Sequence, residues 1–165
     1  MNLKRALKHL LLPPWIMRRT FTAAALQRIE EAVAASESSH RGELCVVIEH
    51  ALDLRPLLRG QTPRERAHEV FARHGVWDTA ENSGVLLYVN WVERDIEIIA
   101  DRGISACVNQ DQWEAICRVI EQSFQAGQFE GGVLEGIRQI TAVLARHFPA
   151  GRDNPDELYN RPAIL

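Results

Sequence analysis

Two spacings of apolar residues recur along the chain. Consecutive β-branched and aliphatic residues are typical of strands, whereas apolar residues three or four positions apart are typical of helices. Strands are predicted at 43–49, 85–89 and 96–100. Helices are predicted at about 20–36, 62–75, 110–125 and 129–147, with a short amphipathic helix at 2–12. The stretches 36–41 and 52–60 are expected to be loops, the second around Pro56.

Capping residues support two of these helices. Thr62 fits the N-cap position, Pro63 fits the first helical position, and Glu65 completes a capping box. Asn109 is the expected N-cap of the helix at 110–125.

The order of the elements indicates an α/β fold. A strand, a helix and a second strand imply a crossover that joins parallel strands. The two strands at 85–89 and 96–100 are separated by a few polar residues, which is typical of a β-hairpin. We therefore expect a three-layer α/β/α sandwich whose small mixed sheet contains a β-hairpin.

The chain divides into three segments around one domain. A length of 165 residues is sufficient for one buried core. Residues 1–19 form a basic amphipathic N-terminal segment, and residues 20–149 form the domain. Residues 150–165 form a C-terminal tail rich in Gly, Asp, Asn and Pro, which is expected to lie loosely on the surface.

The hairpin determines where polar side chains gather. Because its strands are antiparallel, the start of the first lies beside the end of the second. Glu81 and Asn82 should therefore lie beside Asp101 and Arg102. The parallel strand at 43–49 begins at the same edge of the sheet, which also brings Glu43 towards this cluster.

Oxygen ligands at this edge make it a candidate cation site. Calcium and magnesium prefer carboxylate and amide oxygens. The candidate metal ligands are Asp78, Glu81, Asn82, Asp101 and Asp111. Arg102 is a candidate contact for a phosphate group or for a partner, because its guanidinium suits oxyanions. The alternative is structural, since Asp and Asn routinely cap turns and helices.

Charge is distributed unevenly. The net charge is −3, yet no acidic residue precedes Glu30. The candidate membrane contacts in the basic segment are Lys4, Arg5, Lys8, Trp15, Arg18 and Arg19. A Trp beside positive charges is typical of an interfacial anchor, and an anionic membrane surface is a suitable partner. The alternative is a flexible leader whose Trp15 docks on the domain.

Other function classes find little support. The body is acidic and lacks a stripe of basic and aromatic residues, so we expect no nucleic-acid partner. The usual motifs of hydrolases, nucleotide-binding loops and zinc proteases are missing. Three widely spaced cysteines are typical of free thiols in a reducing compartment. We expect a cytoplasmic protein, peripheral at the inner membrane.

Two motifs lie at the ends of the predicted hairpin, the strand entry at 81–87 (ENSGVLL) and the turn at 100–104 (ADRGI). Both resemble the TPM domain family. The strand at 42–49 and the run from Phe124 to Gly131 are also similar to that family. Ser83 stands between Asn82 and Gly84, so the metal-site aspartate of the family falls at Glu81 or is absent.

The resemblance implies a set of expectations. It implies an α/β/α sandwich, calcium binding beside the hairpin in some members, and weak acid phosphatase activity in one plant relative. It also implies roles in maintaining or assembling membrane proteins, with a LemA-type membrane protein as a partner of bacterial members. Our first hypothesis is a non-catalytic, membrane-associated protein-interaction module that binds Ca²⁺ or Mg²⁺. The alternative is a weak metal-dependent phosphatase acting on phosphomonoesters.

Overall fold

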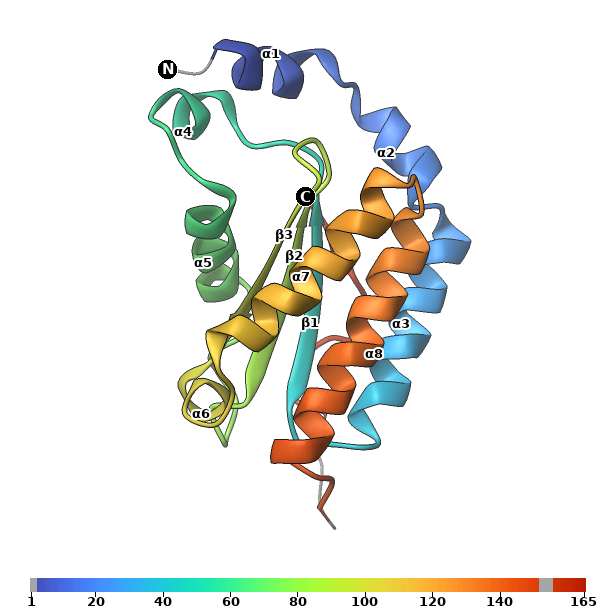
Figure 1. Cartoon of the computed structure of the whole chain (residues 1–165), viewed down its shortest axis with the longest axis vertical. Helices are drawn as coiled ribbons and strands as arrows, with labels where there is room; N and C mark the ends of the chain where they lie inside the picture. Colours follow the sequence, from blue (N-terminus) through green and yellow to red (C-terminus); the bar gives the residue numbers. More distant parts are fainter. Residues whose placement is uncertain (1–2, 152–155) are drawn as a thin grey trace.

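A four-stranded mixed sheet with helices on both faces forms the body of the protein (Figure 1). The structure is a computed structural model that describes residues 3–151 and 156–165. The strands are β1 (Glu43–Glu49), β2 (Gly84–Asn90), β3 (Asp95–Ala100) and β4 (Ala163–Ile164). The helices are α1 (Leu3–Leu11), α2 (Pro14–Thr20), α3 (Ala23–Glu37), α4 (Leu54–Leu58), α5 (Pro63–Arg73), α6 (Arg102–Ser105), α7 (Gln110–Gln125) and α8 (Phe129–His147).

The strand order in the sheet is β3-β2-β1-β4. Strands β1 and β2 are parallel, with Glu43 opposite Gly84, and β4 is parallel to β1. Strands β2 and β3 form the predicted antiparallel hairpin, with Val85 opposite Ala100. The start of β1, the start of β2 and the end of β3 therefore lie at one edge of the sheet.

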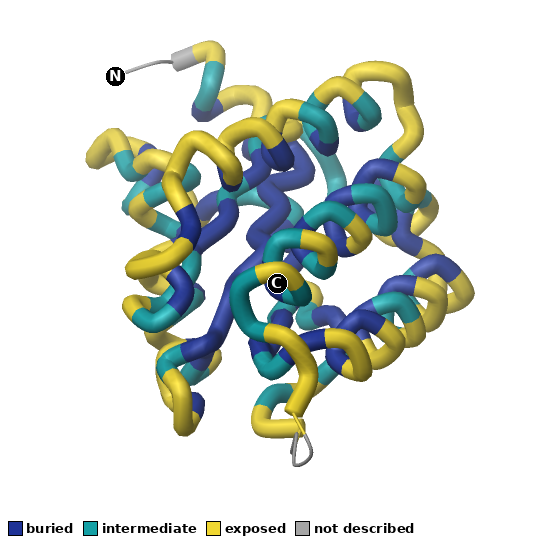
Figure 2. The backbone as a smooth tube through the Cα atoms, turned by 60° about the horizontal axis from the view of Figure 1, so that its bottom comes forward, coloured by how far each residue is buried: buried dark blue, intermediate teal, exposed yellow. Residues whose placement is uncertain are grey.

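Both faces of the sheet are buried, which completes the three-layer α/β/α arrangement. Helices α3, α7 and α8 cover one face, where residues such as Leu87 and Ile120 are fully buried. Helix α5 covers the other face, where Val70 packs with Leu86 and Tyr88. In Figure 2 the strands run dark blue through the centre, and the outer sides of the helices are yellow.

Local sequence signals account for most of these elements. The capping box at Thr62 is present, since its side chain accepts from the Glu65 amide and the Glu65 carboxylate accepts from the Thr62 amide. Asn109 caps α7 in the same way. The predicted α/β fold class and the helices at 110–125 and 129–147 are confirmed.

Four elements differ from the sequence prediction. Helix α4 lies within the segment 52–60, and α6 follows the hairpin directly. Residues 14–20 form helix α2. The expectation of a loose C-terminal tail is wrong for its last residues, because β4 pairs with β1 and Leu158 packs on the α5 face of the sheet. A strand of two residues is too short to show an alternating hydrophobic pattern, and it is a strand only because it pairs with β1.

Candidate functional site

The edge of the sheet where the hairpin begins and ends has the predicted arrangement. The Asp101 amide donates to the carbonyl of Gly84 at 2.8 Å, and the Gly103 amide donates to the carbonyl of Asn82 at 3.0 Å. The Arg102 Nε donates to Asn82 Oδ1 at 2.9 Å. We call residues 81–84 and 101–103 the hairpin edge. The antiparallel pairing has brought Asn82 and Arg102 into contact, as the sequence predicted.

Close backbone approach at the hairpin edge requires its two glycines. A Cβ at Gly84 would lie 1.8 Å from the carbonyl oxygen of Val76, and a Cβ at Gly103 would lie 2.6 Å from those of Glu81 and Asn82. Asn82 itself has a φ of 51°, in the left-handed region that asparagine tolerates better than most residues. These positions fix the loop backbone around the Asn82 and Arg102 side chains.

Other predicted ligands of the hairpin edge have separate partners. Asp101 caps α6 by accepting from the Arg102 amide at 2.7 Å. Its Oδ2 is buried with no hydrogen-bond partner in the described part of the chain. Glu81 forms an ion pair with Arg41 in the loop before β1. The capping role weighed against metal binding is therefore realised at Asp101.

The remaining two predicted ligands lie outside this group of contacts. Asp78 lines a cavity of about 500 Å³ together with His74, Cys45 and part of the C-terminal tail. Asp111 is exposed in the first turn of α7, where its amide donates to Asn109 Oδ1. The metal role of Asp78, Glu81, Asn82, Asp101 and Asp111 stays a prediction.

A different set of carboxylates is suitable for a cation. Glu37 at the end of α3, Glu43 at the start of β1 and Asp156 in the tail each offer an oxygen within 4.8 Å of the others. We call these three residues the acidic cluster. Glu37 is 7 % exposed and Glu43 is 1 % exposed, whereas Asp156 is exposed. An all-carboxylate set of this kind suits a hard cation such as Ca²⁺ or Mg²⁺.

Burial makes the acidic cluster electrostatically unfavourable when it is fully ionised. Desolvation, with a contribution from the charge of Glu43, raises the pKa of Glu37 to about 8. Desolvation also raises the pKa of Glu43, although the amides of Glu157 and Leu158 donate to its Oε2 at 3.2 and 3.1 Å. A proton or a cation would relieve this repulsion. The three residues of the acidic cluster could therefore hold a metal ion.

The sequence analysis placed Glu43 near the hairpin edge and anticipated neither Glu37 nor Asp156 as its neighbour. Glu37 follows Ile29 and Val33 at intervals of four residues, so its position on the buried face of α3 was readable from the helical period. The predicted end of that helix at about Ser36 concealed this signal. Asp156 offered no signal, because the fold of the tail places it there.

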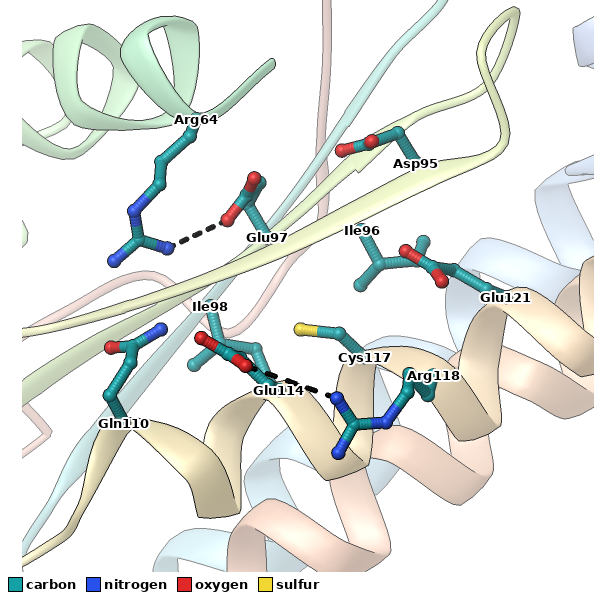
Figure 3. Close-up of a pocket in the computed structure, with 10 residues that line it drawn as sticks. All are labelled: Arg64, Asp95, Ile96, Glu97, Ile98, Gln110, Glu114, Cys117, Arg118 and Glu121. Carbon is teal, nitrogen blue, oxygen red and sulfur yellow. Dashed lines mark hydrogen bonds and ion pairs between the residues drawn. The ribbon is translucent and has the colours of Figure 1, made fainter. Parts of the chain in front are cut away.

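A groove of about 390 Å³ lies along β3, one of the two edge strands, between α5 and α7 (Figure 3). Its charges are largely paired with each other. Arg64 binds Glu97 at 2.8 Å, and Arg118 lies 3.9 Å from Glu114. Asp95 differs, because desolvation and the nearby Glu97 raise its pKa to about 7 and its Oδ1 is buried without a partner in the described chain.

The basic N-terminal segment is folded against the body. We call residues 3–20, which form α1 and α2, the head. Arg5 and His9 of α1 both donate to the Glu93 carboxylate, at 2.5 Å from Arg5 Nε and 2.5 Å from His9 Nε2. The Leu52 amide donates to His9 Nδ1 at 3.0 Å, which leaves the proton on Nε2. Arg5 thus contributes to docking the head.

The outward side of the head is apolar and cationic. Leu7, Leu10 and Leu11 are 52 %, 61 % and 68 % exposed, and they lie three and four residues apart on one face of α1. The exposed Lys4 and Lys8 adjoin that face. Trp15 in α2 is 55 % exposed beneath the Arg19 guanidinium, which lies 4.8 Å from the ring centre. The head is therefore ordered, and Trp15 faces solvent.

The described helices include none that is long and apolar enough to cross a membrane.

Comparison with known proteins agrees with this fold. The model of the TPM domain matches residues 17–143. The solution structure of the BA42 protein from the psychrophilic bacterium Bizionia argentinensis is similar, with 29 % identity and a TM-score of 0.77 over 87 % of this chain and 94 % of that one.

A second solved structure shares the fold alone. The N-terminal domain of a protein from P. gingivalis is 19 % identical, with a TM-score of 0.59 over 79 % of this chain and 82 % of that one. No functionally curated protein matches the chain. The family match covers well over half of the sequence. The chain belongs to the TPM domain family.

Proposed function

We propose that this chain is a non-catalytic TPM domain that docks on an anionic membrane surface through its head and acts there as an interaction module. The observation that carries this proposal is the outward side of the head, where exposed leucines and Trp15 lie among unopposed positive charges. Apolar residues of an interfacial helix enter the boundary between headgroups and acyl chains, and Lys and Arg remain among the headgroups.

The charge of the head supplies an attraction of useful size. Lys4, Lys8, Arg18 and Arg19 form no ion pair within the described ranges of the chain. Each cation near an anionic surface contributes about 1 kcal/mol, so these four contribute roughly 4 kcal/mol at low ionic strength. Apolar contact by the leucines adds to this value. The sum supports reversible membrane association.

Vesicle sedimentation tests the proposal. The full chain should sediment with vesicles that contain phosphatidylglycerol, should bind pure phosphatidylcholine vesicles weakly, and should lose binding as salt rises. Lys4→Glu with Lys8→Glu should weaken binding by more than tenfold, because two attractions become repulsions. Arg73→Glu, an exposed site on α5 outside the head, is the matched control. Equal binding to both lipids, or equal loss in the control, would contradict the proposal.

A membrane-linked protein is the other occupant to consider for this surface. The family resemblance favours a partner of the LemA type. The chain would then fail to bind pure lipid but would bind membranes that carry such a protein, and the Lys4 and Lys8 substitutions would abolish that binding. This result would show that the partner is a protein and would refute the lipid part of the proposal. Metal-dependent turnover of p-nitrophenyl phosphate that Asp101→Ala abolishes would instead favour the phosphatase alternative.

Cation binding by the acidic cluster is a second candidate function. It is supported by two buried carboxylates that face each other, with Asp156 beside them. Titration of Ca²⁺ and then Mg²⁺ into isotopically labelled protein should produce saturable amide shifts around 37, 43 and 156, and Glu43→Gln should remove them. Shifts centred on Asn82 and Asp101 would place the ion at the hairpin edge instead. No shift at millimolar concentrations would refute both sites.

A further inference from the structure

Exposed apolar side chains concentrate at one end of the molecule. In the described ranges, six of the ten large apolar side chains that are exposed belong to α1, α2 and α4: Leu7, Leu10, Leu11, Trp15, Leu54 and Leu58. Isolated exposed leucines are ordinary, but a group of them on neighbouring elements marks an interaction surface.

Helix α4 lies beside α1 at this end (Figure 1). The two helices are joined by a small buried cluster of Ala6, Leu52 and Leu57. On the exposed side of α4, Leu54 and Leu58 are one helical turn apart and are 43 % and 45 % exposed. Because Ala6 of α1 packs against Leu57 of α4, Leu54 and Leu58 lie at the same end of the molecule as the exposed leucines of α1.

The charges on α4 match those on α1. Arg55 and Arg59 are exposed and also lie one turn apart, each next to one of the exposed leucines. The only acidic residue of 53–59 is Asp53, at the N-cap. Helix α4 thus repeats the pattern of α1, in which leucines adjoin lysines. This pattern is suited to a bilayer with anionic headgroups.

The opposite end of the molecule carries the acidic cluster. Strand β1 begins there at Glu43, and α3 ends there at Glu37, far from α1 and α4 in Figure 1. An orientation with α1 and α4 against the lipid therefore holds these carboxylates away from the anionic headgroups. The reverse orientation would bring like charges together.

We propose that α1 and α4 together form the lipid-contacting surface, so that the domain stands on the bilayer with its acidic cluster facing the aqueous phase. This inference rests on the proposed function and adds to it a second contact element and a fixed orientation. A cation or a protein partner then reaches the acidic cluster and the hairpin edge from the aqueous side while the domain is bound. The expected lipid is an anionic phospholipid such as phosphatidylglycerol.

Substitutions in each helix distinguish the inference from the proposed function. Leu54→Ser with Leu58→Ser should weaken binding of the full chain to phosphatidylglycerol vesicles by about tenfold, since both leucines lose their contact with lipid. Leu7→Ser with Leu11→Ser should weaken binding at least as much. Trp77→Ser is the matched control, because Trp77 is 54 % exposed after α5, away from α1 and α4. Circular dichroism should be unchanged in each variant.

Each outcome has a defined meaning. Weakening by both leucine pairs but not by Trp77→Ser supports the two-helix surface. Weakening by the α1 pair alone overturns the inference and leaves the proposed function intact. Binding that survives both pairs refutes both, and loss in the Trp77 control shows unspecific apolar adhesion, which overturns the inference.

A measurement on the folded protein tests the orientation directly. Bicelles that carry a spin-labelled phosphatidylglycerol should broaden the amide signals of 4–11 and 54–58. The signals of Glu37 and Glu43 should keep their intensity. Broadening at Glu37 and Glu43 in place of 54–58 would overturn the inference even if the chain binds the lipid.

Discussion

The charged contacts that hold α1 on the body converge on one carboxylate, which makes Glu93→Gln an informative substitution. Glu93 lies in the turn between β2 and β3 and accepts hydrogen bonds from Arg5 and His9 of α1. Glutamine has nearly the same size but no charge, and its amide NH₂ cannot accept a hydrogen bond. The substitution should therefore release α1 without creating a cavity in the core.

The expected magnitude follows from the geometry. A hydrogen bond to a charged group contributes about 1.5–3 kcal/mol when it is shielded from solvent. The side chains of Arg5 and Glu93 are 23 % and 15 % exposed, so solvent screening reduces the total for the group to about 2 kcal/mol. Two buried contacts of α1 are left in place: the methyl group of Ala6 packs against Leu52 and Leu57, and the Leu52 amide donates to His9 Nδ1. A loss of about 2 kcal/mol makes undocking roughly thirtyfold more frequent.

Hydrogen exchange measures this local opening. The amides of 7–11 should exchange faster in Glu93→Gln, while those of β2 keep their wild-type protection. Trypsin should also cleave faster after Lys8. The matched control is Glu97→Gln, which removes the carboxylate that pairs with Arg64 and does not touch the head. Unchanged exchange in α1, or an equal change in the control, would refute the reasoning.

The same contact predicts a dependence on pH. Burial alone would raise the pKa of Glu93, but the hydrogen bonds from Arg5 and His9 outweigh it and hold the pKa below its ordinary value of 4.5. A carboxylate with a lowered pKa stabilises docking above pH 4.5. That contribution is lost as the pH falls through the pKa of the folded state. Helix α1 of the wild-type protein should therefore undock in acid, and Glu93→Gln should lack this transition.

Four further substitutions test the fold. Burial raises the pKa of Asp95 to about 7, so the contribution of this side chain to stability is fully present below pH 3.8 and is lost as the pH rises through 7. Asp95→Asn should therefore be more stable than wild type by about 1–3 kcal/mol in urea unfolding at pH 8. At pH 4 the two proteins should be equally stable. Gly84→Ala should lower the unfolding free energy by about 3 kcal/mol or more, because the added Cβ overlaps the carbonyl oxygen of Val76. Gly131→Ala should raise the unfolding free energy by up to about 1 kcal/mol, because Gly131 lies in α8 with open space around its Cβ position. Thr62→Ala should cost about 1 kcal/mol in thermal unfolding through loss of the capping box, and an unchanged melting temperature would contradict that account.

The hairpin edge shows how far local signals reach. Asn82 and Arg102 are twenty residues apart, yet antiparallel pairing alone predicts that they meet, and Arg102 Nε does bind Asn82 Oδ1. The helix that begins at Pro63 was equally readable, because its cap is made by residues three positions apart. Such features depend on short-range geometry, which the sequence specifies directly.

The acidic cluster and the α1–α4 surface needed the tertiary structure. Glu37 and Glu43 are joined by Asp156, more than one hundred residues later, only because the tail folds back onto the start of β1. Leu54 joins the head only because Ala6, Leu52 and Leu57 pack together. The sequence by itself determined the three longer strands, the longer helices, their order and the hairpin edge, since hydrophobic period, caps and pairing within a hairpin act between near neighbours. The packing of distant segments decided which carboxylates and which leucines share a surface. The hydrophobic pattern along the chain does not predict contacts between residues so far apart in the sequence.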